Sequence, residues 1–135
     1  MPKHYVLDTS AIFTYTKDEA GSDILEDIFD SAKRRKSLIY LSFITLTELY
    51  YVSWQEKGEE IARELMVLVE SLPMERVDST GPLALLAGRI KANYRLSVAD
   101  AFIGATAIHK QAVLVHKDPE FEALAHVLVE IADRP

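Results

Sequence analysis

Four acidic residues stand where predicted strands end or predicted helices begin, and as a set they could bind a divalent metal ion. They are Asp8, Glu48, Asp100 and Asp118. Carboxylate oxygens are the ligands that Mg²⁺ and Mn²⁺ prefer, whereas zinc sites draw on cysteine and histidine. The chain has no cysteine and no pair of histidines at a ligand spacing. The acids therefore predict a site for Mg²⁺ or Mn²⁺ rather than for zinc.

Each of these acids also has a simpler explanation as part of a helix cap. Asp, Ser and Thr accept hydrogen bonds from the free N–H groups of a first helical turn, and proline is favoured at the first helical position. The fitting pairs are Asp8 before Thr9, Thr45 with Glu48, Ser97 with Asp100, and Asp118 before Pro119. Capping does not explain why four acids would gather at one edge of a sheet, where they repel one another unless a cation neutralises them.

Alternating strands and helices are predicted to position the acids. The strand-forming segments are residues 4–7, 38–41, 74–77, 112–115 and 127–131. Apolar residues at helical spacing predict helices at 24–32, 43–52, 59–72, 83–94, 97–109 and 121–125. Such alternation is typical of a parallel sheet with helices on both faces. Right-handed crossovers bring the carboxyl ends of the strands to one crevice, so we expect all four acids there.

The composition indicates a single domain over residues 1–135. Of the 135 residues, 49% are hydrophobic, which suits one compact core. The net charge of -6 argues against a protein that coats nucleic acid nonspecifically, because such proteins carry a surplus of Lys and Arg. A local basic run at residues 33–36 is either a solvated helix end or a contact for RNA.

Nothing in the sequence predicts a membrane span or a secretory signal. Residues 37–47, an uncharged stretch near the middle, are far shorter than the roughly 20 apolar residues that a membrane helix needs. The first five residues lack the charged start and apolar middle of a signal peptide, and the chain has no cysteine. We therefore expect a soluble, cytoplasmic protein with no membrane partner.

Three segments carry a resemblance to a known family. The segments "VLDTSAI", "TELYY" and "LSVADAFIGATAIHKQAVLVHKDPEF" resemble the PIN-domain ribonucleases, most of all the VapC-type toxins of toxin-antitoxin pairs. The resemblance covers nearly the whole chain and depends on the order and spacing of all four acids. It implies a three-layer α/β/α domain with a central, mostly parallel five-stranded sheet, and a Mg²⁺- or Mn²⁺-dependent endoribonuclease.

The resemblance also assigns roles to the acidic residues. Asp8 and Asp100 would be the principal metal ligands, and Asp118 would bind a second metal ion directly or through water. Glu48 would orient water or a ligand, and Ser10 matches a small hydroxyl residue that supports the site. The four acids are thus both the catalytic and the metal-binding candidates. The resemblance further implies an RNA substrate, an antitoxin partner and a homodimer.

The chain departs from the family at one position and leaves alternatives open. His116 stands where many members have Thr or Ser. An RNA-processing nuclease without an antitoxin, or a noncatalytic binding module that keeps the fold, remains an alternative. A dehalogenase-type phosphatase is disfavoured because Ser10 replaces its second acid, and a receiver domain is disfavoured because its paired acids and late Lys are missing. The aromatic residues Tyr50, Tyr51 and Trp54 suit a protein interface, with burial expected for at least one.

Overall fold

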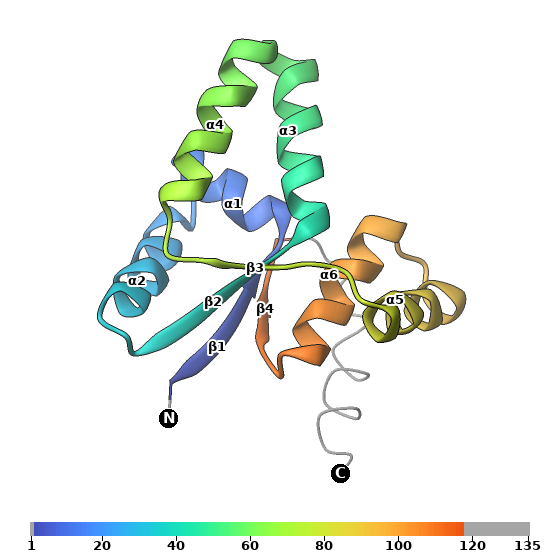
Figure 1. The fold of residues 1–135 in the computed structure, drawn as a ribbon. Coiled ribbons are helices and arrows are strands. Elements are labelled where there is room, and N and C mark those ends of the chain that lie inside the picture. The colour runs from blue at the N-terminus through green and yellow to red at the C-terminus, as the bar shows by residue number, and fades with distance from the viewer. Residues whose placement is uncertain (1, 118–135) are drawn as a thin grey trace.

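The computed structural model describes residues 2–117, which form four strands and six helices (Figure 1). In chain order these elements are β1 (Lys3–Leu7), α1 (Thr9–Thr16), α2 (Ser22–Lys33), β2 (Ser37–Ser42), α3 (Phe43–Lys57), α4 (Glu59–Ser71), β3 (Glu75–Val77), α5 (Gly81–Asn93), α6 (Val98–His109) and β4 (Val113–Val115). Within this part of the chain, no helix is both long and apolar enough to span a bilayer.

The four strands form one parallel sheet in the order β3-β2-β1-β4. Strand β1 is central and pairs with β2 from Lys3 opposite Ser37 and with β4 from Tyr5 opposite Val113. The predicted parallel sheet is confirmed, but the described residues contain four strands rather than the predicted five. The fifth strand, predicted at residues 127–131, and the helix predicted at 121–125 lie outside the described residues.

Two hydrophobic clusters, one on each face of the sheet, make the molecule three-layered. Neighbouring residues of a strand point to opposite faces, so Val6 belongs to one cluster and Leu7 to the other. The Val6 cluster contains residues of α5 and α6, and the Leu7 cluster contains residues of α1, α2, α3 and α4. Figure 1 shows α5 and α6 on one side of the sheet and α3 with α4 extending from it as a long antiparallel pair.

Caps and a glycine set where the helices of the α3–α4 pair begin and end. The N-cap of α3 is Ser42, whose hydroxyl accepts a hydrogen bond from the Ile44 N–H at 3.4 Å. The predicted capping box of Thr45 with Glu48 is therefore wrong, because Thr45 already lies inside the helix. Helix α3 continues to Lys57, beyond its predicted end at residue 52, and stops at Gly58, whose φ of 92° favours glycine.

The Leu7 cluster depends strongly on the aromatic ring of Phe29. This residue is 2% exposed, and its ring lies 4.7 Å from that of Tyr15. We expect Phe29→Ala to lower the free energy of unfolding by about 3–5 kcal/mol, because the cavity adds to the lost burial. Urea unfolding measures the loss. Ile24→Ala on the same helix is the control, since Ile24 is 59% exposed and should change the free energy little.

Candidate functional site

Asp8 lies at the carboxyl end of the central strand and begins helix α1. Its side chain is buried, at 3% exposure, and accepts hydrogen bonds from the Ala11 N–H at 2.7 Å and from the Ser10 hydroxyl at 2.8 and 2.9 Å. The Asp8 N–H donates to the Val115 carbonyl at 3.2 Å, which joins the ends of β1 and β4. The capping prediction is confirmed for Asp8. Burial of a carboxylate at this edge exceeds what a cap requires, since caps are usually exposed.

Thr9 connects Asp8's helix to the second predicted acid. The Thr9 hydroxyl donates to Glu48 Oε1 at 2.7 Å, although the two residues are 39 positions apart in the chain. Glu48 is half-buried and lies in the second turn of α3. The sequence interpretation assigned no role to Thr9. The sequence signal that could have identified Thr9 is a hydroxyl residue directly after an Asp at a strand end. The hydrogen-bond partner of Thr9, however, depends on how α1 packs against α3.

Ser10 connects Asp8 to the segment that follows β4. Its hydroxyl donates to Asp8 and accepts a hydrogen bond from the Lys117 N–H at 3.1 Å. The Lys117 ammonium in turn donates to the Ala20 carbonyl in the turn between α1 and α2, at 2.6 Å. Ser10 therefore holds the chain one residue before Asp118, which itself lies outside the described residues. The supporting role that the resemblance gives Ser10 stays a prediction, and these are the contacts through which it would act.

Asp100 occupies the first turn of α6, as the capping prediction required. Its backbone N–H donates to the hydroxyl of the N-cap residue Ser97 at 3.1 Å, and its side chain is half-buried. The N-terminal halves of α3 and α6 meet through the rings of Phe43 and Phe102, which pack edge to face with centroids 5.2 Å apart. Figure 1 shows both helices beginning on the carboxyl side of the sheet.

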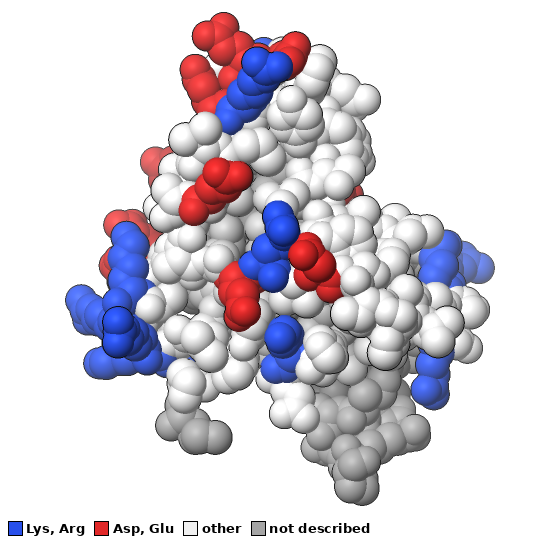
Figure 2. All heavy atoms as spheres, in the orientation of Figure 1, with Lys and Arg blue, Asp and Glu red and all other residues white. Residues whose placement is uncertain are grey.

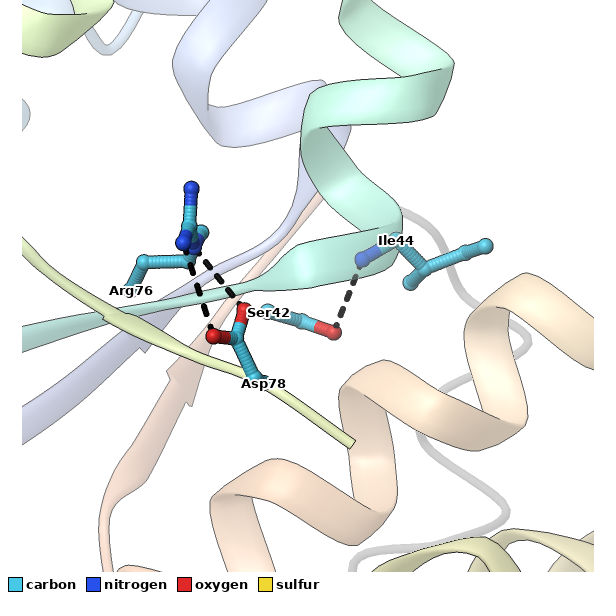
Figure 3. A network of polar contacts seen from close by, with 4 residues as sticks. All are labelled: Ser42, Ile44, Arg76 and Asp78. Carbon is cyan, nitrogen blue, oxygen red and sulfur yellow. Dashed lines mark hydrogen bonds and ion pairs between the residues drawn. The ribbon is translucent and has the colours of Figure 1, made fainter. Parts of the chain in front are cut away.

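Figure 3 shows a helix cap and an ion pair near the ends of β2 and β3. Ser42 points to the Ile44 N–H, and the Arg76 guanidinium points to the Asp78 carboxylate, with Nε 2.8 Å from Oδ1. Register places β3 beside the end of β2, with Val77 opposite Ser42. The Arg76–Asp78 pair is exposed and contributes little stability. The positive charge of Arg76, in β3, is thus neutralised by Asp78 in the loop that follows.

The donor chemistry of the described residues fits a hard cation. The side chains gathered from α1 and α3 present only carboxylate and hydroxyl oxygens, from Asp8, Thr9, Ser10 and Glu48. Such a set suits Mg²⁺ or Mn²⁺ and not zinc. Residues 2–117 contain no group of three or more acidic, histidine or cysteine side chains close enough to hold a metal ion. The convergence of all four acids on one ion therefore stays a prediction.

An open groove of about 280 Å³ lies between α1 and the α3–α4 pair. Phe13, Ile61 and Leu68 line it, and Ile61 and Leu68 are each 42% exposed. At its rim Lys17 Nζ lies 3.4 Å from Glu56 Oε2. The groove therefore combines apolar walls with a charged border, which is typical of a surface that binds another protein.

The aromatic residues of α3 are less buried than we expected. Tyr51 is 45% exposed and Trp54 is 43% exposed, whereas Tyr50 is half-buried and packs edge to face against Trp54 at 5.6 Å. None of the three is fully buried, so the predicted core position is wrong for this group. Large exposed aromatic rings of this kind are enriched at protein interfaces.

Comparisons with known proteins match this arrangement over most of the chain. A family model described as the PIN domain matches residues 5–127. No functionally curated protein matches the chain. Among solved structures, VapBC from Salmonella typhimurium bound to DNA is 28% identical, with a TM-score of 0.67 and coverage of 90% of this chain and 92% of that one.

Two further solved structures share the fold at lower identity. VapBC2 from Rickettsia felis, bound to a DNA fragment of its promoter, has a TM-score of 0.72 at 21% identity, covering 90% of this chain and 93% of that chain. Mycobacterium tuberculosis VapC20, a toxin that cleaves the sarcin-ricin loop, has a TM-score of 0.71 at 17% identity, covering 90% of this chain and 95% of that chain. The chain thus shares its overall fold with these proteins.

Proposed function

We propose, since the chain belongs to the PIN domain family, that it is a metal-dependent endoribonuclease and the toxin of a toxin-antitoxin pair. The observation that carries the proposal is the buried Asp8 carboxylate at the carboxyl end of the central strand, in a chain that the family model matches over residues 5–127. Support for the toxin role comes from the similar structures, which are VapBC complexes and a VapC toxin.

Four acids would hold the metal. Asp8 and Asp100 are the proposed principal ligands, with Asp118 completing the site and Glu48 orienting a water molecule or a ligand. When bound, Mg²⁺ or Mn²⁺ supplies a water of lowered pKa and positive charge near the phosphoryl oxygens. His116, at the end of β4, is half-buried, and we assign it no role in the chemistry.

The protein's own contribution is to hold these acids in fixed positions before RNA arrives. The Ala11 N–H and the Ser10 hydroxyl restrain Asp8, and the Thr9 hydroxyl restrains Glu48. Restrained carboxylates need no reorganisation when charge develops on the substrate, and this preorganisation is a large source of catalytic rate. Burial of Asp8 also lowers the local dielectric, which strengthens its attraction for a cation.

Incubating the purified protein with single-stranded RNA and Mg²⁺ tests the proposal directly. Cleavage that stops when EDTA is added supports a metal-dependent nuclease. Binding of RNA without any cleavage, at Mg²⁺ and Mn²⁺ concentrations up to several millimolar, would instead leave the noncatalytic binding module as the better interpretation. A matched reaction with Asp8→Asn excludes a contaminating nuclease.

The basic run of Lys33, Arg34, Arg35 and Lys36 lies at the end of β2 opposite to the acids. Helix α2 ends at Lys33, the run immediately precedes β2, and all four side chains are exposed. Figure 2 shows blue side chains gathered over the turn between α2 and β2. Six residues of strand separate this run from α3, a distance of about 20 Å. RNA in contact with the run would have to follow the length of the strand to reach Glu48.

Replacing all four residues of the run with Ala decides between its two interpretations. If the run contacts RNA, binding should weaken and the slope of log K against log salt should fall by about 3, since each contact with a single strand contributes roughly 0.7. Fluorescence anisotropy at several salt concentrations measures both quantities. An unchanged slope would show that the run is a solvated helix end that complements the helix dipole.

The antitoxin and the homodimer are the proposed protein partners. The groove lined by Phe13, Ile61 and Leu68 is the proposed antitoxin surface, because its apolar walls are exposed in the single chain. Exposed Tyr51 and Trp54 suit the second interface. Co-expression with the product of a small neighbouring gene, followed by size-exclusion chromatography with light scattering, measures the mass of the homodimer and of the complex with the antitoxin. Elution as a monomer that fails to retain that product would contradict these assignments.

A further inference from the structure

The segment that forms α5 and the turn before α6 concentrates positive charge in a chain that is acidic overall. Residues 79–99 contain no Asp or Glu and carry Arg89, Lys91 and Arg95, whereas the whole chain has a net charge of -6. Figure 2 shows blue and no red side chains on the side of the molecule where Figure 1 places α5. We call these three cations the α5 basic patch.

The side chains of the α5 basic patch are exposed and have no partner within residues 2–117. None of them makes a hydrogen bond or an ion pair there, whereas Lys17, Arg63 and Arg76 are each paired with a carboxylate. A cation without a neighbouring carboxylate keeps its attraction for an external anion, because no internal charge compensates it. The patch is therefore available to a negatively charged ligand.

Arg95 lies on a packed turn directly before the helix that carries Asp100. The Leu96 N–H donates to the Tyr94 carbonyl at 3.0 Å, and Leu96 is a 3% exposed member of the Val6 cluster. Ser97 then caps α6 by accepting a hydrogen bond from the Asp100 N–H at 3.1 Å. The α5 basic patch thus leads along the chain directly to the helical turn of a proposed metal ligand.

A solvated helix end is the competing explanation for the α5 basic patch. Lys91 lies in the last turn of α5, where the helix dipole alone favours a cation. The effect of the dipole is confined to that turn, and Arg89 precedes the turn while Arg95 lies beyond the end of the helix. The dipole therefore accounts for one of the three cations.

We propose that the α5 basic patch binds the phosphate backbone of the RNA substrate beside the acidic site. The inference deepens the proposed function and rests on it. A site built from carboxylates repels a phosphate chain, so nearby cations are needed to hold and position the strand. The basic run at residues 33–36 lies at the opposite edge of the sheet, before the six residues of β2, whereas the α5 basic patch precedes the first turn of α6.

RNA binding measured without metal tests the proposal apart from cleavage. The patch variant carries Arg89→Gln, Lys91→Gln and Arg95→Gln. The matched control removes the same charge at the opposite edge of the sheet and carries Lys33→Gln, Arg34→Gln and Arg35→Gln. Fluorescence anisotropy of a fluorescein-labelled oligouridine in EDTA, at several salt concentrations, gives Kd and the slope of log K against log salt.

We expect the slope to fall by about 2 in the patch variant, because each contact with a single strand contributes about 0.7. The same loss corresponds to binding about 100-fold weaker at roughly 0.1 M salt. The matched control should bind like the wild type. Arg95→Gln alone should weaken binding about fivefold, as expected for one contact, whereas Arg95→Lys keeps the charge and should bind like the wild type.

An equal slope in the patch variant and the wild type overturns the proposal, as does an equal fall in the matched control, which would indicate an effect of net charge alone. Normal RNA binding by a patch variant that no longer retains the product of the small neighbouring gene would assign the patch to a protein partner instead. If the wild type bound no RNA with or without Mg²⁺, the ribonuclease function would fail together with this inference. Circular dichroism establishes that each variant is folded, and the two Arg95 variants keep the test decisive if a triple variant is not.

Discussion

Replacing Asp8 with Asn should abolish RNA cleavage and leave the fold intact. Asn accepts a hydrogen bond at an N-cap about as well as Asp, so the bond from the Ala11 N–H survives and the capping cost is a few tenths of a kcal/mol. The lost negative charge removes the attraction that would hold Mg²⁺ and lower the pKa of its water. Because a bound metal ion supplies several kcal/mol of transition-state stabilisation, we expect cleavage to fall by about 100-fold or more.

Initial rates of single-stranded RNA cleavage and urea unfolding, measured on the same preparations, test this expectation. Asp27→Asn is the matched control, because Asp27 is an exposed acid on α2 and its replacement changes the net charge equally. Asp100→Asn and Asp118→Asn should lose activity like Asp8→Asn. If all three variants cleaved RNA at the wild-type rate, the carboxylates would be caps and the nuclease proposal would fail.

Most of the fold could be predicted from the sequence because its patterns are local. The strand at Lys3–Leu7 and the helix at Ser22–Lys33 follow from runs of strand-forming residues and from apolar residues at helical spacing. The end of α3 was missed because residues 53–57 are Ser, Trp, Gln, Glu and Lys, which continue no apolar helical period. The break between α3 and α4 could be predicted from Gly58, because glycine readily adopts positive φ angles that end a helix. The φ of Gly58 is 92°.

The site was less predictable because its contacts are tertiary. Asp8 was identified from its position after a strand, and its cap is a local contact three residues long. The bond from Thr9 to Glu48 joins residues 39 apart, and the bond from Lys117 to Ser10 joins residues 107 apart. Sequence spacing cannot predict such pairs before the packing of α1 against α3 and β4 is known. The incorrect capping box of Thr45 with Glu48 has a local origin instead, because Ser42, three residues earlier, is an equally suitable cap.

Removing the metal should stop cleavage and also change the stability of the protein. Ligand that binds only the folded state stabilises it by RT ln(1 + [L]/Kd), so Mg²⁺ at 100 times Kd adds about 2.7 kcal/mol to the free energy of unfolding. For a domain of this size that is roughly 10 °C in melting temperature. We expect EDTA to reverse both effects and added Mg²⁺ or Mn²⁺ to restore them.

The comparison of wild type with Asp8→Asn in the same melts separates a metal ligand from a cap. Without metal, neighbouring carboxylates repel one another, so neutralising one of them should leave the melting temperature equal or higher. With saturating Mg²⁺ the order should reverse, because the wild type gains the binding free energy and the Asn variant gains little of it. A cap predicts a small loss of stability that is the same with and without Mg²⁺. Equal Mg²⁺ stabilisation of the two proteins would therefore exclude Asp8 as a metal ligand. Undiminished cleavage after thorough chelation would exclude a metal ion from the reaction.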